Sequence, residues 1–198
     1  IKQLLLLLKS DMNKLMSSKA PKKKIKIIVF GGVPLSTKIV KDLISIDEVD
    51  LVGVVISGDV KHSSNDPWLD EYLQDYAIVN KIKRFKLSDL NYLFKQKELD
   101  YGFSCRFSKI ITEEIIDLFK IGIINFHGGL LPEMGGVNTV CHSILLNKNN
   151  AGGTIHFIDN GIDTGRIIDR LEFKVDIDDT SYNLYKKTQL SLWELYKR

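Results

Sequence analysis

The chain has 198 residues, enough to bury one sizeable core, and this length favours one domain over two. A hydrophobic share of 44% and a charged share of 27% are typical of globular proteins, and a net charge of +3 is too small to indicate a nucleic-acid partner. The two cysteines, Cys105 and Cys141, are too few for a disulfide framework. We therefore expect reduced thiols in a cytoplasmic protein.

Residues 1–24 are expected to form an N-terminal extension that ends in a basic linker. Five consecutive leucines at 4–8 make an apolar run that is well short of the ~20 residues of a membrane span, and the flanking residues do not resemble a targeting segment. The lysines at 22–24 are best read as a solvated linker, with a phosphate-binding patch as the alternative. We expect an amphipathic helix that packs on the body of the protein or on a partner.

A regular alternation of apolar runs and helical patterns begins at residue 25. Strands are predicted at 25–32, 50–57, 78–79, 100–105 and 121–126. Helices are predicted from Pro34, near 68–76, over 87–99 with Ser88 as N-cap, and over 112–120 with Thr112 as N-cap. This order predicts an α/β fold with a doubly wound, mostly parallel sheet flanked by helices.

The second half of the chain has a different pattern. A helix is predicted over 137–147, followed by strands at 152–159 and 166–175 that a glycine-containing loop joins. The last segment, 180–198, has Leu184, Leu190 and Trp193 at roughly helical spacing. It is expected to be a packing helix, which completes a domain over 25–198.

Asn125 and His127 are the first candidates for a functional site. Residues two apart on a strand point to the same face, so the two side chains converge if the strand extends that far. They also lie at the carboxyl end of a predicted strand, where α/β sheets bind ligands. An amide can donate to an oxygen that gains negative charge, and an imidazole can act as acid or base. Asp163, in a glycine-flanked loop, is the candidate carboxylate to hold the imidazole. The alternative is that all three are loop-forming polar residues.

The other histidines are weaker candidates. His62 is expected to be solvated in a polar loop, and His156 to be a hydrogen-bonded structural residue within a strand. His142 lies between Cys141 and Ser143, which suggests a nucleophile beside a base. Neighbours on a helix diverge by about 100 degrees, however, so this trio is not favoured.

The segment "NFHGGLLP" at 125–132, with "DTG" at 163–165, resembles the formyltransferase family that uses N10-formyltetrahydrofolate. The likeness extends from Ile25 to Val175, and both motifs occur at family-like spacing. It implies a Rossmann-like formyltransferase domain, with Asn125, His127 and Asp163 as the catalytic trio. It also implies N10-formyltetrahydrofolate as the donor co-substrate, and no metal.

The same resemblance implies where the pterin lies. It is expected against the backbone of two segments, with the contacts assigned to Lys109, Ile110, Ile111, Ile158, Asp159 and Ile162. The acceptor must bring its amine to the face of Asn125 and His127, so it is expected to cross the segment 132–138, where the assigned residues are Pro132, Gly135, Gly136 and Asn138. The alternative is that this segment is only a flexible connector.

Two departures from the family pattern concern the acceptor. Gly135–Gly136 stands where many relatives have Arg-Gly, and His142 stands where many have Trp. The purine enzymes normally carry a Gly-Ser-Asn loop after the first strand, which "FGGVPLS" lacks, and the tRNA enzymes add an RNA-binding barrel. The favoured acceptor is therefore an amino sugar carried by a nucleotide, such as a dTDP-4-amino-4,6-dideoxyhexose used in O-antigen or other glycan biosynthesis.

Methionyl-tRNA and glycinamide ribonucleotide are the alternative acceptors, and an inactive α/β binding domain is the alternative from another class. The expected partners are thus folate and a small nucleotide sugar, without nucleic acid or membrane. The oligomeric state is left open, a homodimer included.

Overall fold

The computed structural model describes residues 23–57 and 71–198. Within them the strands form one sheet of seven in the order β3-β2-β1-β4-β5-β6-β7. The strands are β1 (Ile25–Gly31), β2 (Val49–Ile56), β3 (Arg84–Phe85), β4 (Leu99–Cys105), β5 (Phe119–His127), β6 (Asn150–Phe157) and β7 (Ile167–Lys174). The α-helices are α2 (Pro34–Ile44), α3 (Leu73–Val79), α4 (Leu90–Leu93), α5 (Glu113–Ile116), α6 (Thr139–Leu145) and α7 (Ser181–Lys197).

Strands β1 to β5 pair in parallel, whereas β6 and β7 run antiparallel to their neighbours. The predicted α/β class and mostly parallel sheet are thus confirmed.

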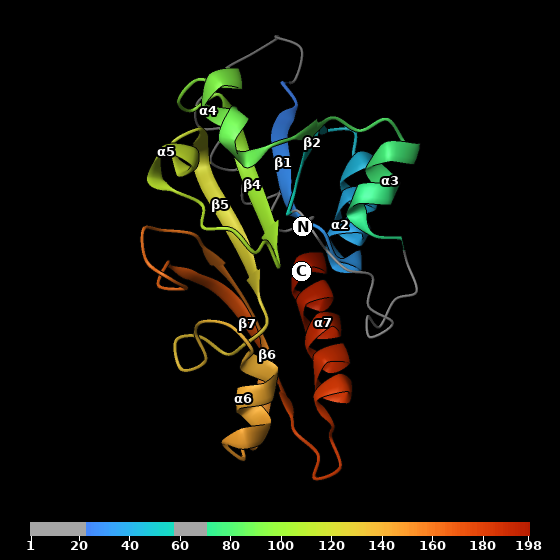
Figure 1. Cartoon of the computed structure of the whole chain (residues 1–198), viewed down its shortest axis with the longest axis vertical. Coiled ribbons are helices and arrows are strands. Elements are labelled where there is room, and N and C mark those ends of the chain that lie inside the picture. Colours follow the sequence, from blue (N-terminus) through green and yellow to red (C-terminus); the bar gives the residue numbers. More distant parts are fainter. Residues whose placement is uncertain (1–22, 58–70) are drawn as a thin grey trace.

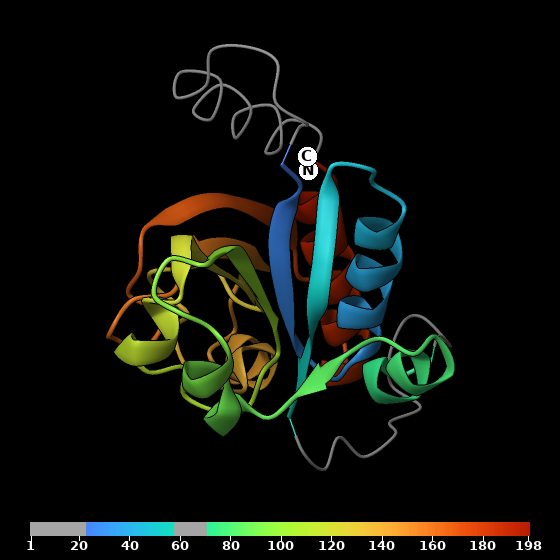
Figure 2. The same cartoon turned by 90° about the horizontal axis from the view of Figure 1, so that it is seen from above.

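Helices cover both faces of the parallel part of the sheet (Figures 1 and 2). Alternate residues of β1 serve opposite faces, as the pleat requires. Ile27 and Val29 pack in a core with α2, α3 and α7, and Ile28 and Phe30 pack in a second core with α4 and α5. Burial on both faces explains why these strands are continuous apolar runs in the sequence.

The chain reverses its direction of winding between β1 and β4. From β1 it proceeds outward to β2 and β3, and it then returns to β4 and continues to β5 on the other side. The carboxyl ends of these strands therefore meet at the middle of the molecule (Figure 1). Such a switch point is where open α/β sheets bind ligands.

One predicted element between β2 and β4, the strand at 78–79, was wrong. Ile78 and Val79 belong to helix α3, and both are largely exposed, while Leu73 and Ala77 are its buried residues. The edge strand is instead Arg84–Phe85, which pairs with β2. The strand preference of an Ile-Val pair is weak beside the burial that a helix gains by packing Leu73 and Ala77. The expected start of this helix at 68–70 lies outside the described residues.

Helices α4 and α5 are each a single turn, shorter than predicted. The Ser88 hydroxyl donates to the Asp89 carboxylate (2.8 Å) and caps no helix. Thr112 does occupy the N-cap position of α5, but its side chain makes no capping bond. The segment after α5 leaves the helix early because Leu118 and Phe119 are buried in the core beside β5.

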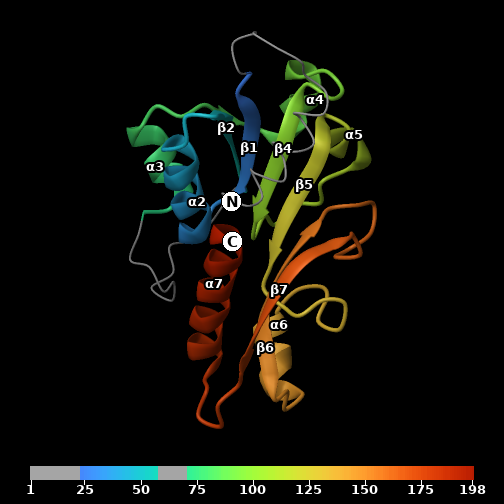
Figure 3. The same cartoon turned by 180° about the vertical axis from the view of Figure 1, so that it is seen from behind.

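Helix α7 is the long C-terminal packing helix that the sequence predicts. Thr180 caps it by accepting a bond from the Asn183 amide (3.2 Å). Its buried side includes Leu184, Leu192 and Leu195, whereas Leu190 is half exposed, so the predicted apolar spacing was wrong at that residue. Figure 3 shows α7 running alongside the β6–β7 end of the molecule.

The predicted N-terminal extension lies outside the described residues, apart from its last two. In the described ranges no helix is both long and apolar enough to cross a membrane.

Candidate active site

Asn125 and His127 are the last alternate residues of β5, so the strand extends as far as the predicted convergence requires. The imidazole of His127 is buried, and Asn125 is partly exposed. Across the antiparallel pair, Asn125 faces His156 and His127 faces Thr154. Four polar side chains therefore lie in two adjacent rows at the carboxyl end of β5.

Asp163 lies close to His127, as expected, from the loop between β6 and β7. Its Oδ2 atom is 3.4 Å from His127 Nδ1, and its Oδ1 atom is 3.5 Å from His156 Nε2. The Gly136 amide donates to Oδ2 at 2.8 Å. The backbone of Asp163 is left-handed (φ 54°), a conformation that aspartate tolerates better than most residues. The structure thus brings Asn125, His127 and Asp163 to one place.

His156 is a residue whose connection to this site the sequence reading missed. Its Nδ1 atom lies 2.8 Å from the Phe157 carbonyl oxygen, which can only accept, so Nδ1 carries a proton. In the neutral tautomer Nε2 then accepts from the Asn125 amide nitrogen (3.1 Å). This bond orients the amide and leaves its second N–H available. The available signal was the pair Thr154 and His156, which are polar residues at alternate positions of an otherwise apolar strand.

Both ring nitrogens of His127 face oxygen atoms. Nε2 lies 2.7 Å from the Met134 carbonyl oxygen and must donate to it, because a carbonyl oxygen has no proton to give. Nδ1 faces the Asp163 carboxylate. The ring can therefore hold a proton on each nitrogen with an acceptor opposite each one.

Burial by itself raises the pKa of Asp163, but its partners outweigh that effect. The hydrogen bond that His156 donates when it is protonated, the Gly136 amide and the charges of the two imidazoles in their protonated forms together hold the pKa below its usual value. Asp163 is consequently a carboxylate at neutral pH, able to orient an imidazolium or to accept a proton.

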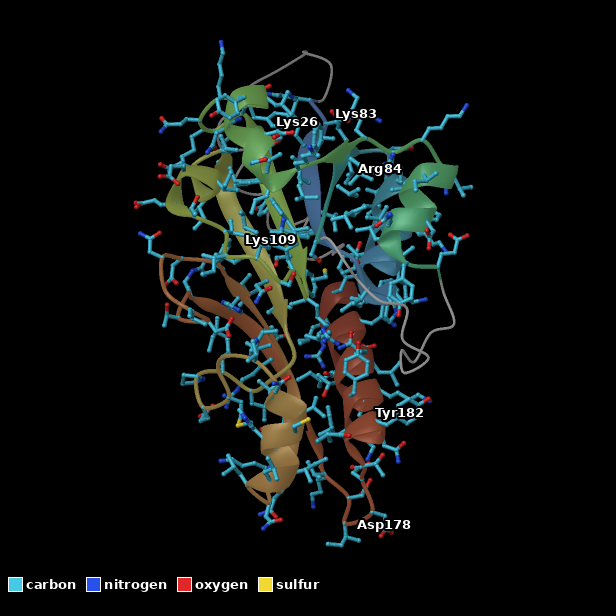
Figure 4. All side chains as sticks on the ribbon, viewed as in Figure 1. Lys26, Lys83, Arg84, Lys109, Asp178 and Tyr182 are labelled. Atoms are coloured by element: carbon cyan, nitrogen blue, oxygen red, sulfur yellow. The ribbon has the colours of Figure 1, made fainter. Side chains whose placement is uncertain are left out.

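The two predicted folate segments differ in how far their backbone and side chains are engaged. Among the described residues, no hydrogen bond engages the backbone of 109–111, and Ile110 is largely exposed, as is Ile162. Figure 4 shows Lys109 near the carboxyl end of β4, far from Lys26 at the other end of the sheet. The segment 109–111 therefore offers unengaged backbone groups, and Ile110 and Ile162 offer exposed apolar side chains.

The other predicted folate residues have structural partners. Ile111 is buried in the core, and the Ile158 amide donates to the Ile123 carbonyl (2.7 Å). The Asp159 carboxylate accepts from the Gly161 amide (3.0 Å) and the Thr164 hydroxyl (2.7 Å). Asp159 therefore shapes the loop that carries Asp163.

The predicted acceptor residues lie on the connection from β5 to α6. Pro132, Gly135 and Asn138 are exposed, and Gly136 is partly exposed. A Cβ atom on Gly135 would lie 3.8 Å from the Asp163 Cβ, so this glycine borders the site directly. Asn138 makes no capping bond to α6, which leaves its side chain available. Across the described ranges, no cluster of three or more His, Cys, Asp or Glu is arranged to hold a metal ion.

A sequence profile of the formyl transferase family matches residues 23–196. The methionyl-tRNA formyltransferase of Bacillus subtilis is 29% identical over 170 residues, which are 83% of this chain and 53% of that protein. The chain spans about half of that relative's length and 31% of the Elusimicrobium minutum methionyl-tRNA formyltransferase.

Solved structures are also similar to this chain. The N-formyltransferase of Helicobacter canadensis, in complex with folinic acid and dTDP-3-aminofucose, is 29% identical with a TM-score of 0.70, over 87% of this chain and 61% of that one. Phosphoribosylglycinamide formyltransferase of Anaplasma phagocytophilum has a TM-score of 0.71 at 20% identity, over 88% of this chain and 83% of that one. The second likeness supports the fold alone.

Proposed function

The chain belongs to the formyl transferase family, and we propose that it transfers a formyl group from N10-formyltetrahydrofolate to the amino group of a nucleotide-linked amino sugar. The observation that carries this proposal is the convergence of Asn125, His127 and Asp163 at the carboxyl end of β5. An amide donor, an imidazole and a low-pKa carboxylate are the groups that acyl transfer to an amine requires.

Asn125 and His127 stabilise the negative charge that develops on the formyl oxygen. The second N–H of the Asn125 amide, which His156 leaves free, donates to that oxygen. His127, with Nε2–H on the Met134 carbonyl and Nδ1 toward Asp163, contributes positive charge beside it. No covalent bond to the enzyme forms in this scheme.

Asp163 handles the proton of the incoming amine. As the amine nitrogen bonds to the formyl carbon it becomes acidic, and the Asp163 carboxylate, which lies beside His127 (3.4 Å), accepts its proton. That proton then goes to the N10 nitrogen as the bond between N10 and the formyl carbon breaks. The oxyanion returns to a carbonyl, so the products are the formamide and tetrahydrofolate.

The two proposed folate segments have groups that fit a folate. The unengaged backbone at 109–111 can bond the polar edge of a pterin, and the exposed side chains of Ile110 and Ile162 can cover its flat faces. When bound there, the folate would supply the activated formyl group. The Helicobacter canadensis relative, which binds folinic acid, supports this donor.

Two observations favour an amino sugar as acceptor. The Helicobacter canadensis protein binds a dTDP-amino sugar and is 29% identical, whereas the purine enzyme at 20% is evidence of fold only. Gly136, whose amide bonds to Asp163, also leaves open space for a pyranose ring, since no atom lies within 4 Å of a Cβ placed on it.

An assay of tetrahydrofolate release with a panel of acceptors tests the proposal. The panel contains dTDP-linked 3-amino and 4-amino sugars, UDP-amino sugars and glycinamide ribonucleotide. Turnover with one nucleotide-linked amino sugar, and formation of its formamide by mass spectrometry, is the expected result. Absence of release with every amine would favour a binding domain without activity.

Methionyl-tRNA is the second candidate acceptor, because the Bacillus subtilis relative is a methionyl-tRNA formyltransferase and is also 29% identical. Adding charged initiator tRNA to the same assay separates the two. Release that depends on methionyl-tRNA, and not on any sugar nucleotide, would replace the amino-sugar assignment.

A further inference from the structure

The connection at 128–138, here called the active-site loop, holds two of the three proposed catalytic residues. Its Met134 carbonyl accepts the bond from His127 Nε2 (2.7 Å), and its Gly136 amide donates to Asp163 Oδ2 (2.8 Å). The direct contact between His127 and Asp163 is longer, at 3.4 Å. The position of the loop therefore sets the relative position of the imidazole and the carboxylate.

The loop is itself held mainly by side chains. It has one internal backbone bond, from the Met134 amide to the Leu130 carbonyl (2.8 Å), within the described residues. Thr139 donates to the Gly128 carbonyl where the loop meets α6. The buried Thr154 hydroxyl donates to the Gly129 carbonyl (2.6 Å) and accepts from the Leu131 amide (3.1 Å). The hydrogen bonds from these two threonines therefore hold the first part of the loop, as far as the amide of Leu131.

Arg170, on strand β7, provides the next anchor. Its Nη1 atom donates to the Leu131 carbonyl at 2.7 Å, and the same atom lies 3.4 Å from the Glu133 carboxylate. Arg170 pairs directly with Thr154, which pairs directly with His127, so the three residues form one row across β7, β6 and β5. The loop and β7 lie side by side in Figures 1 and 3.

We propose that Arg170 is a positioning residue for formyl transfer. By holding the Leu131 carbonyl, its guanidinium fixes the half of the active-site loop whose Met134 carbonyl and Gly136 amide orient His127 and Asp163. This inference rests on the proposed function of the same site. A charged donor with a rigid, planar head makes a strong and directional bond to a carbonyl, which a flexible lysine reproduces only in part.

The expected effect falls on kcat more than on donor binding. A small misplacement of reacting groups can cost about 100-fold in rate, so Arg170→Ala should lower kcat by about 10- to 100-fold. The KM for N10-formyltetrahydrofolate should stay within about twofold, because the side-chain hydrogen bonds and ion pair of Arg170 in the described structure go to Leu131 and Glu133 and not to the proposed folate segments at 109–111 and 158–162. Arg170→Lys, which keeps one charged donor, should recover part of the lost rate.

A matched control separates this role from loss of charge. Arg198→Ala removes an exposed guanidinium that pairs with Asp169, the neighbour of Arg170 on strand β7 (3.3 Å). This is an exposed ion pair outside the proposed site, so the variant should keep kcat within about twofold.

The pH profile of kcat gives a readout that general destabilisation would not change. His127 from β5 and His156 from β6 are the titratable groups that face Asp163, and the loop adds the Gly136 amide. Loosening of that amide removes one of the bonds that hold the pKa of Asp163 low. The acid limb of the profile should therefore move to higher pH in Arg170→Ala and return toward the wild-type position in Arg170→Lys.

Hydrogen exchange tests the proposal without any activity. The amides of Leu131, Met134 and Gly136 should exchange about tenfold faster in Arg170→Ala than in the wild type, and at the wild-type rate in Arg198→Ala. Unchanged exchange at all three amides would overturn the inference, even if the chain transfers no formyl group to any amine. Faster exchange in an active enzyme whose kcat and pH profile are unaltered would overturn it as well. If Arg170→Ala does not fold, the same comparison is made with Arg170→Lys, which should show a smaller change in the same direction.

Discussion

Asn125 and His127 lie two positions apart on one strand, yet different neighbours fix them. His156 holds the amide of Asn125, and the carbonyl of Met134 holds the ring of His127. The strand points both side chains to the same face of the sheet, and the neighbouring groups fix the orientation of the amide and of the ring. Each side chain can therefore be altered with little effect on the other.

Replacing either residue by alanine should remove stabilisation of the oxyanion. We expect Asn125→Ala and His127→Ala to lower turnover by about 100- to 1000-fold, with circular dichroism showing a folded protein. Asn80→Ala is the control, because it removes an amide from the exposed end of α3. Near-wild-type turnover in either site variant would contradict the assigned roles.

Asp163 should also link the stability of the fold to pH. Its pKa is lower in the folded chain than in the unfolded chain, where aspartate titrates near ~3.9. The ionised group thus stabilises the fold above that value, and the stabilisation is lost as the pH falls through the folded pKa. The loss in free energy of unfolding caused by Asp163→Asn should be largest at pH 7 and shrink below about pH 4. Urea titrations at several pH values measure it, and a loss independent of pH would refute the prediction.

At the scale of elements, the sequence predicted what depends on local pattern and missed what depends on distant contacts. The apolar runs of β1 and β4 and the Pro34 start of α2 are visible in the sequence because each is specified by neighbouring residues. The helix at Ile78–Val79 was missed because the burial of Leu73 and Ala77 outweighed local preference. The residues of the site were likewise predictable where local pattern places them and not where distant contacts do.

The convergence of Asn125 and His127 could be predicted from strand periodicity alone. The addition of Asp163 to them could be predicted from the family-like spacing of its motif. His156 and Arg170 could not be connected to them from spacing alone. Their contacts with Asn125 and Leu131 span 31 and 39 positions and depend on the register of β6 and β7. Register is set by the whole sheet, and no short motif carries it.

The two adjacent glycines of the active-site loop have different roles. Gly136 has φ 87°, a conformation that disfavours any side chain, whereas a methyl group on Gly135 would make ordinary contacts with Leu131 and Asp163. Gly135→Ala should therefore narrow the acceptor side and raise the KM for the sugar nucleotide about tenfold, with little change for the formyl donor. Gly136→Ala should lower kcat as well, because its amide bonds to Asp163. Equal changes in the KM values for the sugar nucleotide and the formyl donor in Gly135→Ala would indicate that this segment is a connector that does not contact the acceptor.

A partly buried hydrogen bond joins helices α2 and α7. The hydroxyl of Tyr196 donates to the Asp42 carboxylate at 2.8 Å, and burial together with that carboxylate raises the pKa of the tyrosine. Tyr196→Phe should lower the free energy of unfolding by about 1.5 kcal/mol, as expected for a bond to a charged group. Tyr182→Phe, which alters a half-exposed tyrosine of the same helix, is the control for urea denaturation. Equal stability of the two variants would mean that the bond contributes nothing.

At the scale of the whole molecule, the order of the sheet decides which distant segments can share a ligand. The loop after β4 and the loop after β6 are about fifty residues apart in sequence, but β5 alone separates their strands. β6 runs antiparallel to β4, but it ends opposite Ile124, close to Phe126, where β4 ends, so the two loops leave the sheet at nearly the same level. A flat ligand can therefore contact both loops while its reactive end reaches Asp163.

Binding of folinic acid should protect these two segments together. Backbone amides of 109–112 and 158–163 should exchange more slowly when the compound is present, because the proposed pterin contacts are made by backbone groups. The same protection should occur in Asn125→Ala, since that change affects the chemistry and leaves the backbone contacts intact. Helix α3 and strand β3, at the far edge of the sheet, are the internal reference and should not change. Protection of only one segment would place the pterin elsewhere, and protection of neither, at concentrations that raise the melting temperature, would refute the folate placement.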